Sequence, residues 1–570
     1  MPCFLSLALI MACLAATGAG LIPLALSLCA IAASASAFLF SRLAAGRRLI
    51  LCAAMAVGFI LLTAIPLPPW TDPVVGHERV RQNCVARQAL ADAQKLSPNL
   101  PRLGWFALTR NRAGSMRIVL LAALMLSGGA LAAGADAEWK KRMLLAIILL
   151  GSAVALAGIA GAWVWPQGKT LLWIIPVEHG RPMGAFMNRN HCGGFAAMLC
   201  PAAIAAAGNA AERRSFAAAA AYACAFAALA ACAVLSLSRG AWLACGAGLA
   251  AMALFQALKR RSRLTAAATV LAMIALAAAL ALPNRAVLER AGSLRKGLGE
   301  TTIAMRIRTW KDAAPVFLDH PFLGVGANAF RAVFPRYRTA STRPSFKHAE
   351  NEYVQIPVEL GIVGSCALGL LLIATFWDWR RKCASEGCDH LFVSCAVGAA
   401  AAAAAHASCD FAIRIPLYSF TLAAVCGLAW PASVGQRPIA AQPALRCPAA
   451  ALLAATIAVA LHGRSIYRAD DSDWLMRAPA PELARALAWS PTSWQAWYHF
   501  GRRMLEENPV SAQPLAHSFI STAAEYDPLN YRLWAELCML RASLGDRTGA
   551  EEAFSRMKML RAWMNVTNME

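Results

Sequence analysis

The fold of this chain is decided by apolar stretches such as Met143-Leu-Leu-Ala-Ile-Ile-Leu-Leu-Gly-Ser-Ala-Val-Ala-Leu-Ala-Gly-Ile-Ala-Gly-Ala-Trp-Val164, in which no residue is charged. A helix of this length spans about 33 Å, enough to cross the hydrocarbon core of a bilayer. Three basic residues, Lys140, Lys141 and Arg142, precede it. Over the whole chain 59% of the residues are hydrophobic and only 15% are charged, unlike a soluble domain. The stretch therefore predicts one span of a membrane protein.

Similar apolar runs recur along the chain and predict about thirteen membrane spans. They cover residues 3–19, 21–40, 49–68, 116–133, 143–164, 191–207, 215–235, 239–257, 264–282, 353–376, 389–406, 415–433 and 447–463. Each span must satisfy its backbone hydrogen bonds internally, which favours helices. We therefore expect an all-α fold, a polytopic membrane helix bundle over residues 1–463. The first run has no Lys or Arg before it and is interpreted as a membrane anchor rather than a cleaved signal peptide.

Clusters of Lys and Arg in the short connections predict how the bundle is oriented. The clusters are Arg42/Arg47/Arg48, Lys140/Lys141/Arg142, Arg213/Arg214, Lys259/Arg260/Arg261/Arg263 and Arg380/Arg381/Lys382. With an inside N-terminus they all fall on one side, which the positive-inside rule makes cytoplasmic. The longer connections 69–115, 165–190 and 284–352, and the C-terminal tail, then face outward.

The net charge of +23 would suggest nucleic acid for a soluble protein. Here it divides between the cytoplasmic clusters and the outer connections, so membrane lipids or a phosphate-bearing substrate are the expected partners, and nucleic acid is not. Most of the 18 Cys lie in apolar runs, with no disulfide framework and no metal-type spacing. No P-loop, HExxH, nucleophile elbow or Asp-rich motif is present, so we expect no bound metal and no cofactor.

Residues 464–570 differ from the rest because they carry more charge, more Trp and Tyr, and no spanning run. The segment Ser490-Pro491-Thr-Ser-Trp494-Gln-Ala-Trp497 is echoed by Asp527-Pro528-Leu-Asn-Tyr531-Arg-Leu-Trp534, with a Trp six residues after each Pro. This pattern resembles tetratricopeptide helix pairs. It predicts a helical-repeat domain, which either docks a protein partner or acts as a structural cap.

The outward connection 284–352 is the strongest candidate for a site. From Arg285 to Lys347 it carries twelve Lys/Arg against four Asp/Glu, and it holds the Gly-rich turn Gly324-Val-Gly326. Arg306 and Arg308 precede Trp310 in a helix expected at the interface. Paired Arg side chains bind phosphate in a bidentate manner, and contact with lipid headgroups is the alternative. Arg239, between two apolar runs, is a second anion-binding candidate, with snorkelling to the headgroups as its alternative.

Acid–base candidates follow this connection. His348 is a candidate base for a hydroxyl proton, or a hydrogen-bonding residue at a helix start. Glu350 and Glu352 are alternative bases, or acidic residues favoured by the dipole of a first helical turn. Glu359 sits further into the span, where a carboxylate needs a partner.

Two further groups complete the candidates. His406 and Asp410 are spaced i, i+4, so on a helix they share a face, where they would orient a catalytic group or brace a neighbouring loop. In the connection 165–190, Asn190 is predicted to cap the helix that follows it.

Together these fragments resemble the O-antigen ligase / O-antigen polymerase family of bacterial inner-membrane glycosyltransferases. In the family's order, the resemblance is carried by Gly184-Ala-Phe186-Met-Asn188-Arg-Asn190, Ser238-Arg239-Gly240-Ala, Arg306-Ile-Arg-Thr-Trp310, His320-Pro321-Phe-Leu-Gly324-Val-Gly326-Ala-Asn-Ala-Phe330, His348-Ala-Glu-Asn351-Glu-Tyr353-Val-Gln355 with Glu359-Leu-Gly361, and His406-Ala-Ser-Cys-Asp410-Phe411. It implies a GT-C-like membrane domain over 1–463, multi-pass in the inner membrane, with a large periplasmic loop 284–352. Residues 464–570 would form a periplasmic tetratricopeptide-like domain, where a protein partner would dock.

The resemblance also implies an activity, the metal-independent transfer of a glycan from undecaprenyl diphosphate to an acceptor hydroxyl. The acceptor would be lipid A-core, another lipid-linked glycan or a protein. Arg239, Arg306 and Arg308 would bind the diphosphate, and His348 or Glu350 would act as base, because Glu350 stands where the family often has a His. The implied supporting residues are Asn188, Asn190, Gly324, Gly326, Asn351, Glu359, His406 and Asp410.

Two other classes compete with this expectation. A multi-spanning transporter or flippase would more often show repeated spans and charged or broken helices at mid-membrane, and the sequence shows neither. A membrane-anchored repeat scaffold would leave the basic connection without a purpose. Ligase, polymerase and protein glycosylation share the same motifs and stay open within the first class.

Overall fold

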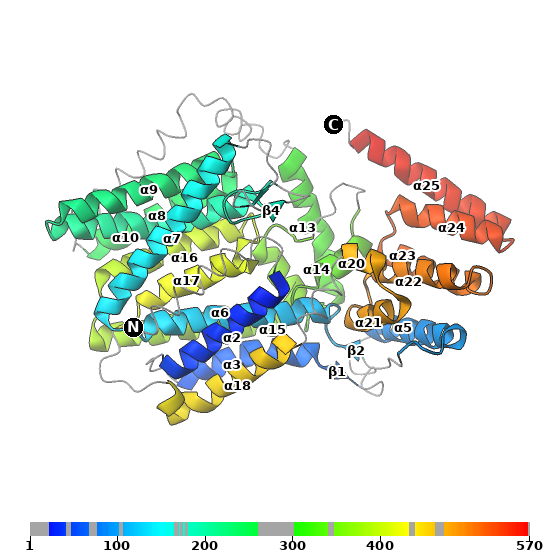
Figure 1. Ribbon diagram of the computed structural model, residues 1–570, viewed down its shortest axis with the longest axis horizontal. Helices are drawn as coiled ribbons and strands as arrows, with labels where there is room; N and C mark the ends of the chain where they lie inside the picture. Colours follow the sequence, from blue (N-terminus) through cyan, green and yellow to red (C-terminus); the bar gives the residue numbers. More distant parts are fainter. Residues whose placement is uncertain are drawn as a thin grey trace.

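A computed structural model describes residues 22–40, 47–67, 77–101, 106–164, 170–171, 175–176, 181–259, 301–339, 347–431, 439–461 and 472–567. Its membrane part is a bundle of long helices, seen on the left of Figure 1. These helices are α2 (Ile22–Phe40), α3 (Arg47–Ala64), α6 (Arg112–Ala133), α7 (Ala137–Val164), α8 (Arg189–Glu212), α9 (Phe216–Leu235), α10 (Arg239–Lys259), α15 (Glu352–Glu386), α16 (His390–Ala407), α17 (Pro416–Leu428) and α18 (Pro443–Leu461).

The predicted all-α membrane fold is confirmed. Eleven of the expected spans coincide with these helices, and the expected spans 3–19 and 264–282 lie outside the described residues. Seven of the described helices, namely α6, α7, α8, α9, α10, α15 and α16, are long and apolar enough to cross a membrane. The strands are two-residue pieces: β1 (Pro66–Leu67) pairs with β2 (Phe106–Ala107), and β3 (Thr170–Leu171) with β4 (Ile175–Pro176).

Helix α8 is the centre of the bundle, because 89% of its apolar stretch is buried inside the protein. Small residues let its neighbours approach closely, as is typical of helices packed in membranes. A Cβ on Gly193 would lie 2.2 Å from the Ser236 hydroxyl oxygen, and one on Gly194 would lie 2.4 Å from the ring of His406. The start of α8 is therefore pressed against the end of α9 and the end of α16.

Helix α15 is interrupted at Gly361, whose φ of 62° and ψ of −168° are not helical. The turn Pro321–Gly326 fills the interruption. The amides of Val325 and Gly326 donate to the carbonyls of Val358 and Glu359, at 3.0 and 2.8 Å, and the amides of Ile362 and Val363 donate to those of Pro321 and Phe322, at 2.8 and 3.1 Å. The Gly-rich turn of the sequence thus satisfies the backbone groups that the break exposes.

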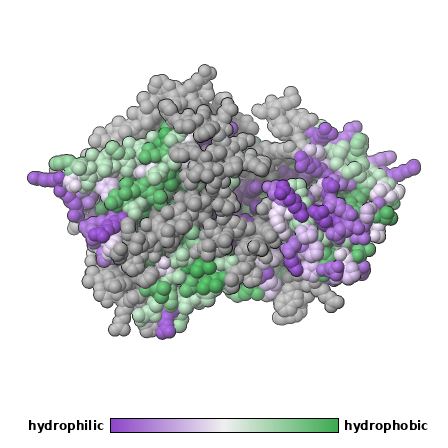
Figure 2. Space-filling model, in the orientation of Figure 1, coloured by the Kyte–Doolittle hydropathy of each residue, from purple (hydrophilic) through white to green (hydrophobic). Residues whose placement is uncertain are grey.

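Outside the bundle lie α5 (His77–Leu96), α13 (Thr301–Asp319), α14 (Phe330–Val333) and a set we call the C-terminal helices. The latter are α20 (Ser472–Arg477), α21 (Ala480–Trp489), α22 (Trp494–Glu507), α23 (Gln513–Tyr526), α24 (Tyr531–Ser543) and α25 (Arg547–Thr567). Short 3-10 helices η3 (Phe334–Arg336), η4 (Ala412–Arg414) and η5 (Ile439–Ala441) complete the elements. Figure 2 shows hydrophobic residues over the bundle and mainly hydrophilic ones over the C-terminal helices.

The repeat read in the sequence has a structural counterpart in the C-terminal helices. The indole of Trp497 donates to the carbonyl of Pro491 at 2.9 Å, and the indole of Trp534 donates to that of Pro528 at the same distance. Each contact fastens a helix to the turn before it. Trp497 is buried, and the core around it includes Phe500 and Phe519, whose rings stack with their centroids 4.9 Å apart. The repeated Pro and Trp residues therefore make the same contact in two places.

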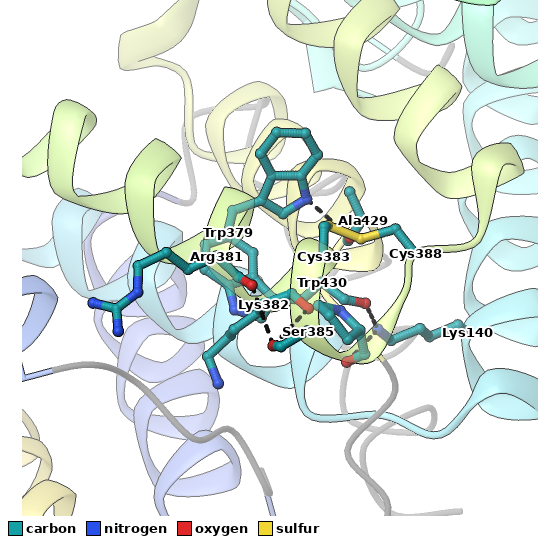
Figure 3. Close-up of a disulfide and its surroundings, with 10 residues drawn as sticks. Lys140, Trp379, Arg381, Lys382, Cys383, Ser385, Cys388, Ala429 and Trp430 are labelled. Carbon is teal, nitrogen blue, oxygen red and sulfur yellow. Dashed lines mark hydrogen bonds between the residues drawn. A yellow bond between two sulfur atoms is a disulfide. The ribbon is translucent and has the colours of Figure 1, made fainter. Parts of the chain in front are cut away.

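The bundle has two distinct ends. One, which we call the basic end, joins the start of α7 and the ends of α15 and α17. There Lys140 donates to the Trp430 carbonyl, and the Trp379 indole donates to the Ala429 carbonyl at 3.1 Å (Figure 3). The basic clusters at 140–142 and 380–382 thus lie at the same end, as the sequence predicts.

A disulfide joins Cys383 and Cys388 at the basic end, across the connection between α15 and α16 (Figure 3). The spacing of the Cys residues in the sequence indicates no disulfide framework and does not predict this pair. The two residues come together because α15 ends at Glu386 and the chain turns back before α16, so five residues of separation become a short distance in space.

Candidate active site

The opposite end of the bundle, which we call the site end, collects most of the polar candidates. The starts of α8, α10 and α15 meet there with α13, the segment 347–351 and the connection 408–415 between α16 and α17. The amide of Arg110 donates to the Val325 carbonyl at 2.8 Å, which adds the start of α6. Residues far apart in sequence are thus brought together at one end of the helices.

Arg306 and Glu350 form the pair at the centre of this end. Nη2 of Arg306 lies 3.2 Å from Oε2 of Glu350, and Nη1 donates to the Cys409 carbonyl at 2.6 Å. The side chains of Arg306 and Glu350 are 22% and 18% exposed, so both keep some access to solvent. Arg306 therefore joins α13 to the segment before α15 and to the connection after α16.

The backbone and charge state of Glu350 are both unusual. Its φ is +55°, a left-handed conformation that costs a non-glycine residue about 1 kcal/mol or more and is often found at functional sites. Burial and the nearby charge of Asp410 raise the pKa of Glu350 to about 7, although Arg306 and His191 oppose the rise. A carboxylate with this pKa both accepts and releases a proton near neutral pH.

Asp410 is paired with His191 across the bundle. Oδ1 of Asp410 lies 3.1 Å from Nε2 of His191, with both side chains under 10% exposed. Burial alone would raise the pKa of Asp410, but the charges of His191, His406 and Arg306 outweigh burial and lower it. Asp410 is therefore an ionised, enclosed carboxylate close to Glu350.

His348 is held by stacking and by one hydrogen bond. Its ring stacks on Phe411 with centroids 4.0 Å apart, and His191 meets the same Phe411 edge-on at 4.7 Å. Nδ1 of His348 lies 3.1 Å from Nε2 of Gln355. Burial and the charge of Arg414 hold the pKa of His348 well below its usual value, so the ring is neutral at physiological pH.

A buried ionic network lies behind these residues. Arg414 binds both carboxylate oxygens of Glu352, at 2.6 and 2.8 Å, and one oxygen of Glu359 at 2.9 Å. Glu359 also accepts from Gln355 at 2.7 Å and from the Asn328 amide at 2.8 Å. Burial would lower the pKa of Arg414, but the charges of Glu352 and Glu359 outweigh burial and raise it. Glu359 thus has the partner its position demands.

The structure brings some of the predicted residues to this site and leaves others apart. Asn351 caps α15 by accepting from the Tyr353 amide at 2.9 Å. Gly240, next to Arg239, lies against Cys409, since a Cβ on it would be 2.6 Å from Sγ. Arg239 therefore starts α10 beside the connection that Arg306 contacts. The Arg306–Arg308 pair is not formed: Arg308 is exposed and donates to Thr339 at 3.2 Å, because residues two apart point to different sides of α13.

Two local predictions are wrong. The cap of α8 is Asn188, which accepts from the Asn190 amide at 2.9 Å, so Asn190 belongs to the first turn instead of capping it. His406 and Asp410 do not share a helix face, because α16 ends at Ala407 and Asp410 lies in the turn beyond it. His406 is instead buried against Gly194, and Asp410 turns to His191.

Sequence reasoning missed four residues of the site: His191, Gln355, Phe411 and Arg414. All four lie in or beside the family motifs given above. The residue type and position of each would not by itself indicate a site. Gln355 is fully buried between His348 and Glu359, so its amide is shared by two residues that the sequence singled out. A buried amide between two candidates is visible only once the helix is placed.

The arrangement offers a cation for an anion and a carboxylate for a proton, side by side. A guanidinium has five N–H donors, and the contacts described above use two of those on Arg306, so a phosphate can bind to others. Among the residues that the structure describes, no group of three His, Cys, Asp or Glu is placed to hold a metal ion.

Fold and site together define a polytopic membrane protein with a polar, partly enclosed site at one end of its helices. Residues 224–369 match the family model described as O-antigen ligase. The chain therefore carries an O-antigen ligase family region, which runs from within α9 to the middle of α15 and includes Arg239, Arg306, His348 and Glu350. This family implies a glycosyltransferase-like enzyme, and the apolar helices fit a multi-pass membrane protein. No curated protein matches it.

The matched region does not contain the whole site. His191 and Asp410 lie on either side of residues 224–369, yet they contact each other and, through Phe411, approach His348. The site is therefore assembled from the family region and from helices that flank it in sequence.

Proposed function

We propose that this chain transfers a glycan from an undecaprenyl-diphosphate-linked donor to an acceptor hydroxyl at the periplasmic face of the bacterial inner membrane. The observation that carries the proposal is the Arg306–Glu350 pair, which lies within the O-antigen ligase region at the site end of the bundle. The pair supplies the two things that such a transfer requires, a fixed cation for the leaving diphosphate and a base for the hydroxyl.

The bond changes follow from these two groups. The acceptor oxygen attacks the anomeric carbon and forms the new glycosidic bond, while the bond from that carbon to the diphosphate oxygen breaks. The hydroxyl proton passes to the carboxylate of Glu350, and the diphosphate leaves with the bonding electrons. Arg306, with Arg239 beside the same connection, stabilises the charge that develops on the diphosphate without a metal ion.

We assign the role of base to Glu350 and a positioning role to His348. The pKa of Glu350, raised to about 7 by burial and Asp410, suits a general base near neutral pH. The lowered pKa of His348 makes its ring a weaker base, and its contacts with Phe411 and Gln355 suit a side chain that shapes the site. Arg308 is left outside the diphosphate site in this assignment.

The membrane setting supports the choice of a lipid-linked donor. The site end lies opposite the basic end, and the positive-inside rule puts the basic end in the cytoplasm. The site would then open where nucleotide sugars are absent. We propose accordingly a membrane domain over residues 1–463 and a periplasmic, tetratricopeptide-like domain over 464–570.

The decisive experiment is deletion of the gene followed by gel analysis of lipopolysaccharide and of lipid-linked glycan. Loss of long glycan with accumulation of lipid-linked polymer identifies a ligase, and a single-repeat band identifies a polymerase. Unchanged bands with loss of protein glycosylation identify a protein acceptor. Unchanged glycans in every fraction would contradict the proposal, including its transfer step.

Complementation with Glu350→Ala and His348→Ala then tests the assignment of the base. We expect no complementation by Glu350→Ala and partial complementation by His348→Ala, at equal levels of inserted protein. Full activity of Glu350→Ala would overturn the assignment.

A further inference from the structure

Among the described residues, several polar contacts join the C-terminal helices to the rest of the chain, and three of them are compared here. Arg81 of α5 lies 3.5 Å from Glu525, in an ion pair whose side chains are 47% and 58% exposed. The hydroxyl of Ser490 donates to the Arg110 carbonyl at 3.1 Å. The third contact joins Arg338, just after η3, to Asp527 at 2.6 Å.

The third contact leads directly to α13. Thr339, next to Arg338, is bound through its amide and its hydroxyl to the carboxylate of Asp312, both at 2.9 Å. The hydroxyl of Tyr337, on the other side of Arg338, donates to Asp319 at 2.7 Å. Three consecutive residues therefore tie α13 on one side to the C-terminal helices on the other.

Helix α13 in turn holds the site. Arg306 contacts Glu350 from this helix, and one turn further on the indole of Trp310 donates to the Ala349 carbonyl at 2.8 Å. Asp312 follows two residues later. The contacts of α13 with the site and its contacts with Thr339 are thus separated by less than two helical turns.

The Arg338–Asp527 pair is poorly explained as a simple source of stability. Its side chains are only 10% and 6% exposed, and burying two charges costs free energy that their attraction does not always return. Burial indeed raises the pKa of Asp527 despite the presence of Arg338. A buried pair of this kind specifies geometry, because moving either side chain leaves a buried charge without its partner.

We propose that Arg338 and Asp527 are positioning residues through which the C-terminal helices hold α13, and with it Arg306 and Glu350, in the geometry of the site. The C-terminal helices then support the site directly, whether or not they also bind a protein partner. The effect on glycan transfer rests on the proposed function, whereas the mechanical coupling to α13 does not.

Hydrogen exchange of the full chain in nanodiscs tests the coupling without an activity assay. In Asp527→Ala we expect amides of residues 306–314 and 347–351 to exchange about tenfold faster or more, because Arg338 loses a buried partner. Asp527→Asn keeps an oxygen that accepts from Arg338 and should lie between the wild type and Asp527→Ala. Glu525 lies two residues from Asp527. Glu525→Ala breaks the exposed pair with Arg81 and should leave these amides unchanged.

Transfer rates of the same variants supply the second measurement. A misplaced catalytic pair is expected to lower kcat about 10- to 100-fold in Asp527→Ala while the KM for the donor changes little, and Glu525→Ala should match the wild type. Unchanged exchange of α13 in Asp527→Ala, or equal effects of Asp527→Ala and Glu525→Ala, would overturn the inference. An inactive wild type with the expected exchange would contradict the proposed function and still support the coupling.

Discussion

The substitution Gly361→Ala tests whether the interruption of α15 and the turn that fills it form one unit. Gly361 has φ and ψ values that are essentially restricted to glycine. A Cβ at this position would lie 2.4 Å from the Phe322 carbonyl oxygen and 2.5 Å from the Gly324 nitrogen. Both obstacles are backbone atoms, so the turn Pro321–Gly326 has to move away from α15.

The cost can be estimated from the contacts that such a movement breaks. The backbone conformation alone costs an alanine about 1–3 kcal/mol. The four hydrogen bonds across the interruption contribute about 1 kcal/mol each, and some of them are lost when the turn withdraws. We therefore expect Gly361→Ala to lower the free energy of unfolding by about 3–6 kcal/mol.

The assay is a titration of purified chain from mixed micelles into SDS, followed by tryptophan fluorescence. Gly369→Ala is the matched control, because Gly369 lies in the same helix with nothing within 4 Å of an added Cβ. The control should be neutral or more stable by about 0.5–1 kcal/mol. Equal stability of the two variants would refute the interpretation of the Gly-rich turn.

Two further predictions concern the two ends of the bundle. Arg414→Met leaves the carboxylates of Glu352 and Glu359 buried without their cation and should cost about 3–5 kcal/mol in the same titration, whereas Arg485→Met, which breaks an exposed pair with Glu482, should cost under about 1 kcal/mol. Equal costs would contradict the buried network. The cytoplasm proposed for the basic end would keep Cys383 and Cys388 reduced, so the disulfide is tested on purified, oxidised chain, where Cys383→Ser should cost at most about 2 kcal/mol because the loop that it closes is short. Its transfer rate should equal that of the wild type, because the disulfide lies at the end opposite the site; a large loss of rate would show that the two ends are coupled.

The sequence predicted the membrane helices well because each span is a local property of some twenty residues. Hydrophobic length alone indicated α6–α10, α15 and α16, and the Pro–Trp spacing indicated the repeated turns around Trp497 and Trp534. The role of the Gly-rich turn was not predictable, because it depends on an interruption at Gly361 that no local signal announces.

The partners of the candidate residues were the harder part. Glu359 was expected to need a partner, but Arg414 could be identified only after α15 and the connection before α17 were placed together. Asp410 was matched by its spacing to His406, whereas its contact is with His191, more than two hundred residues earlier. The Arg306–Arg308 pair was suggested by proximity in sequence, and the helix sends the two side chains in different directions.

The raised pKa of Glu350 carries a cost that depends on pH. A rise from 4.5 to about 7 means that the folded chain holds the proton more tightly than the unfolded chain, so stability falls as pH rises through this window. The full cost, about 3 kcal/mol, is present above pH 7 and absent below about pH 4.5. Glu350→Gln should remove this dependence.

The most direct test of the central claim is the pH dependence of transfer between about pH 5 and 9 in the wild type, Glu350→Gln and His348→Gln. If Glu350 is the base, the wild-type rate rises about tenfold for each pH unit up to about pH 7 and then levels off. The reason is that the carboxylate must be ionised to accept the proton. Glu350→Gln should be slow and independent of pH, while His348→Gln should keep the wild-type shape at a lower rate. Loss of the acid limb in His348→Gln, with its retention in Glu350→Gln, would contradict the account.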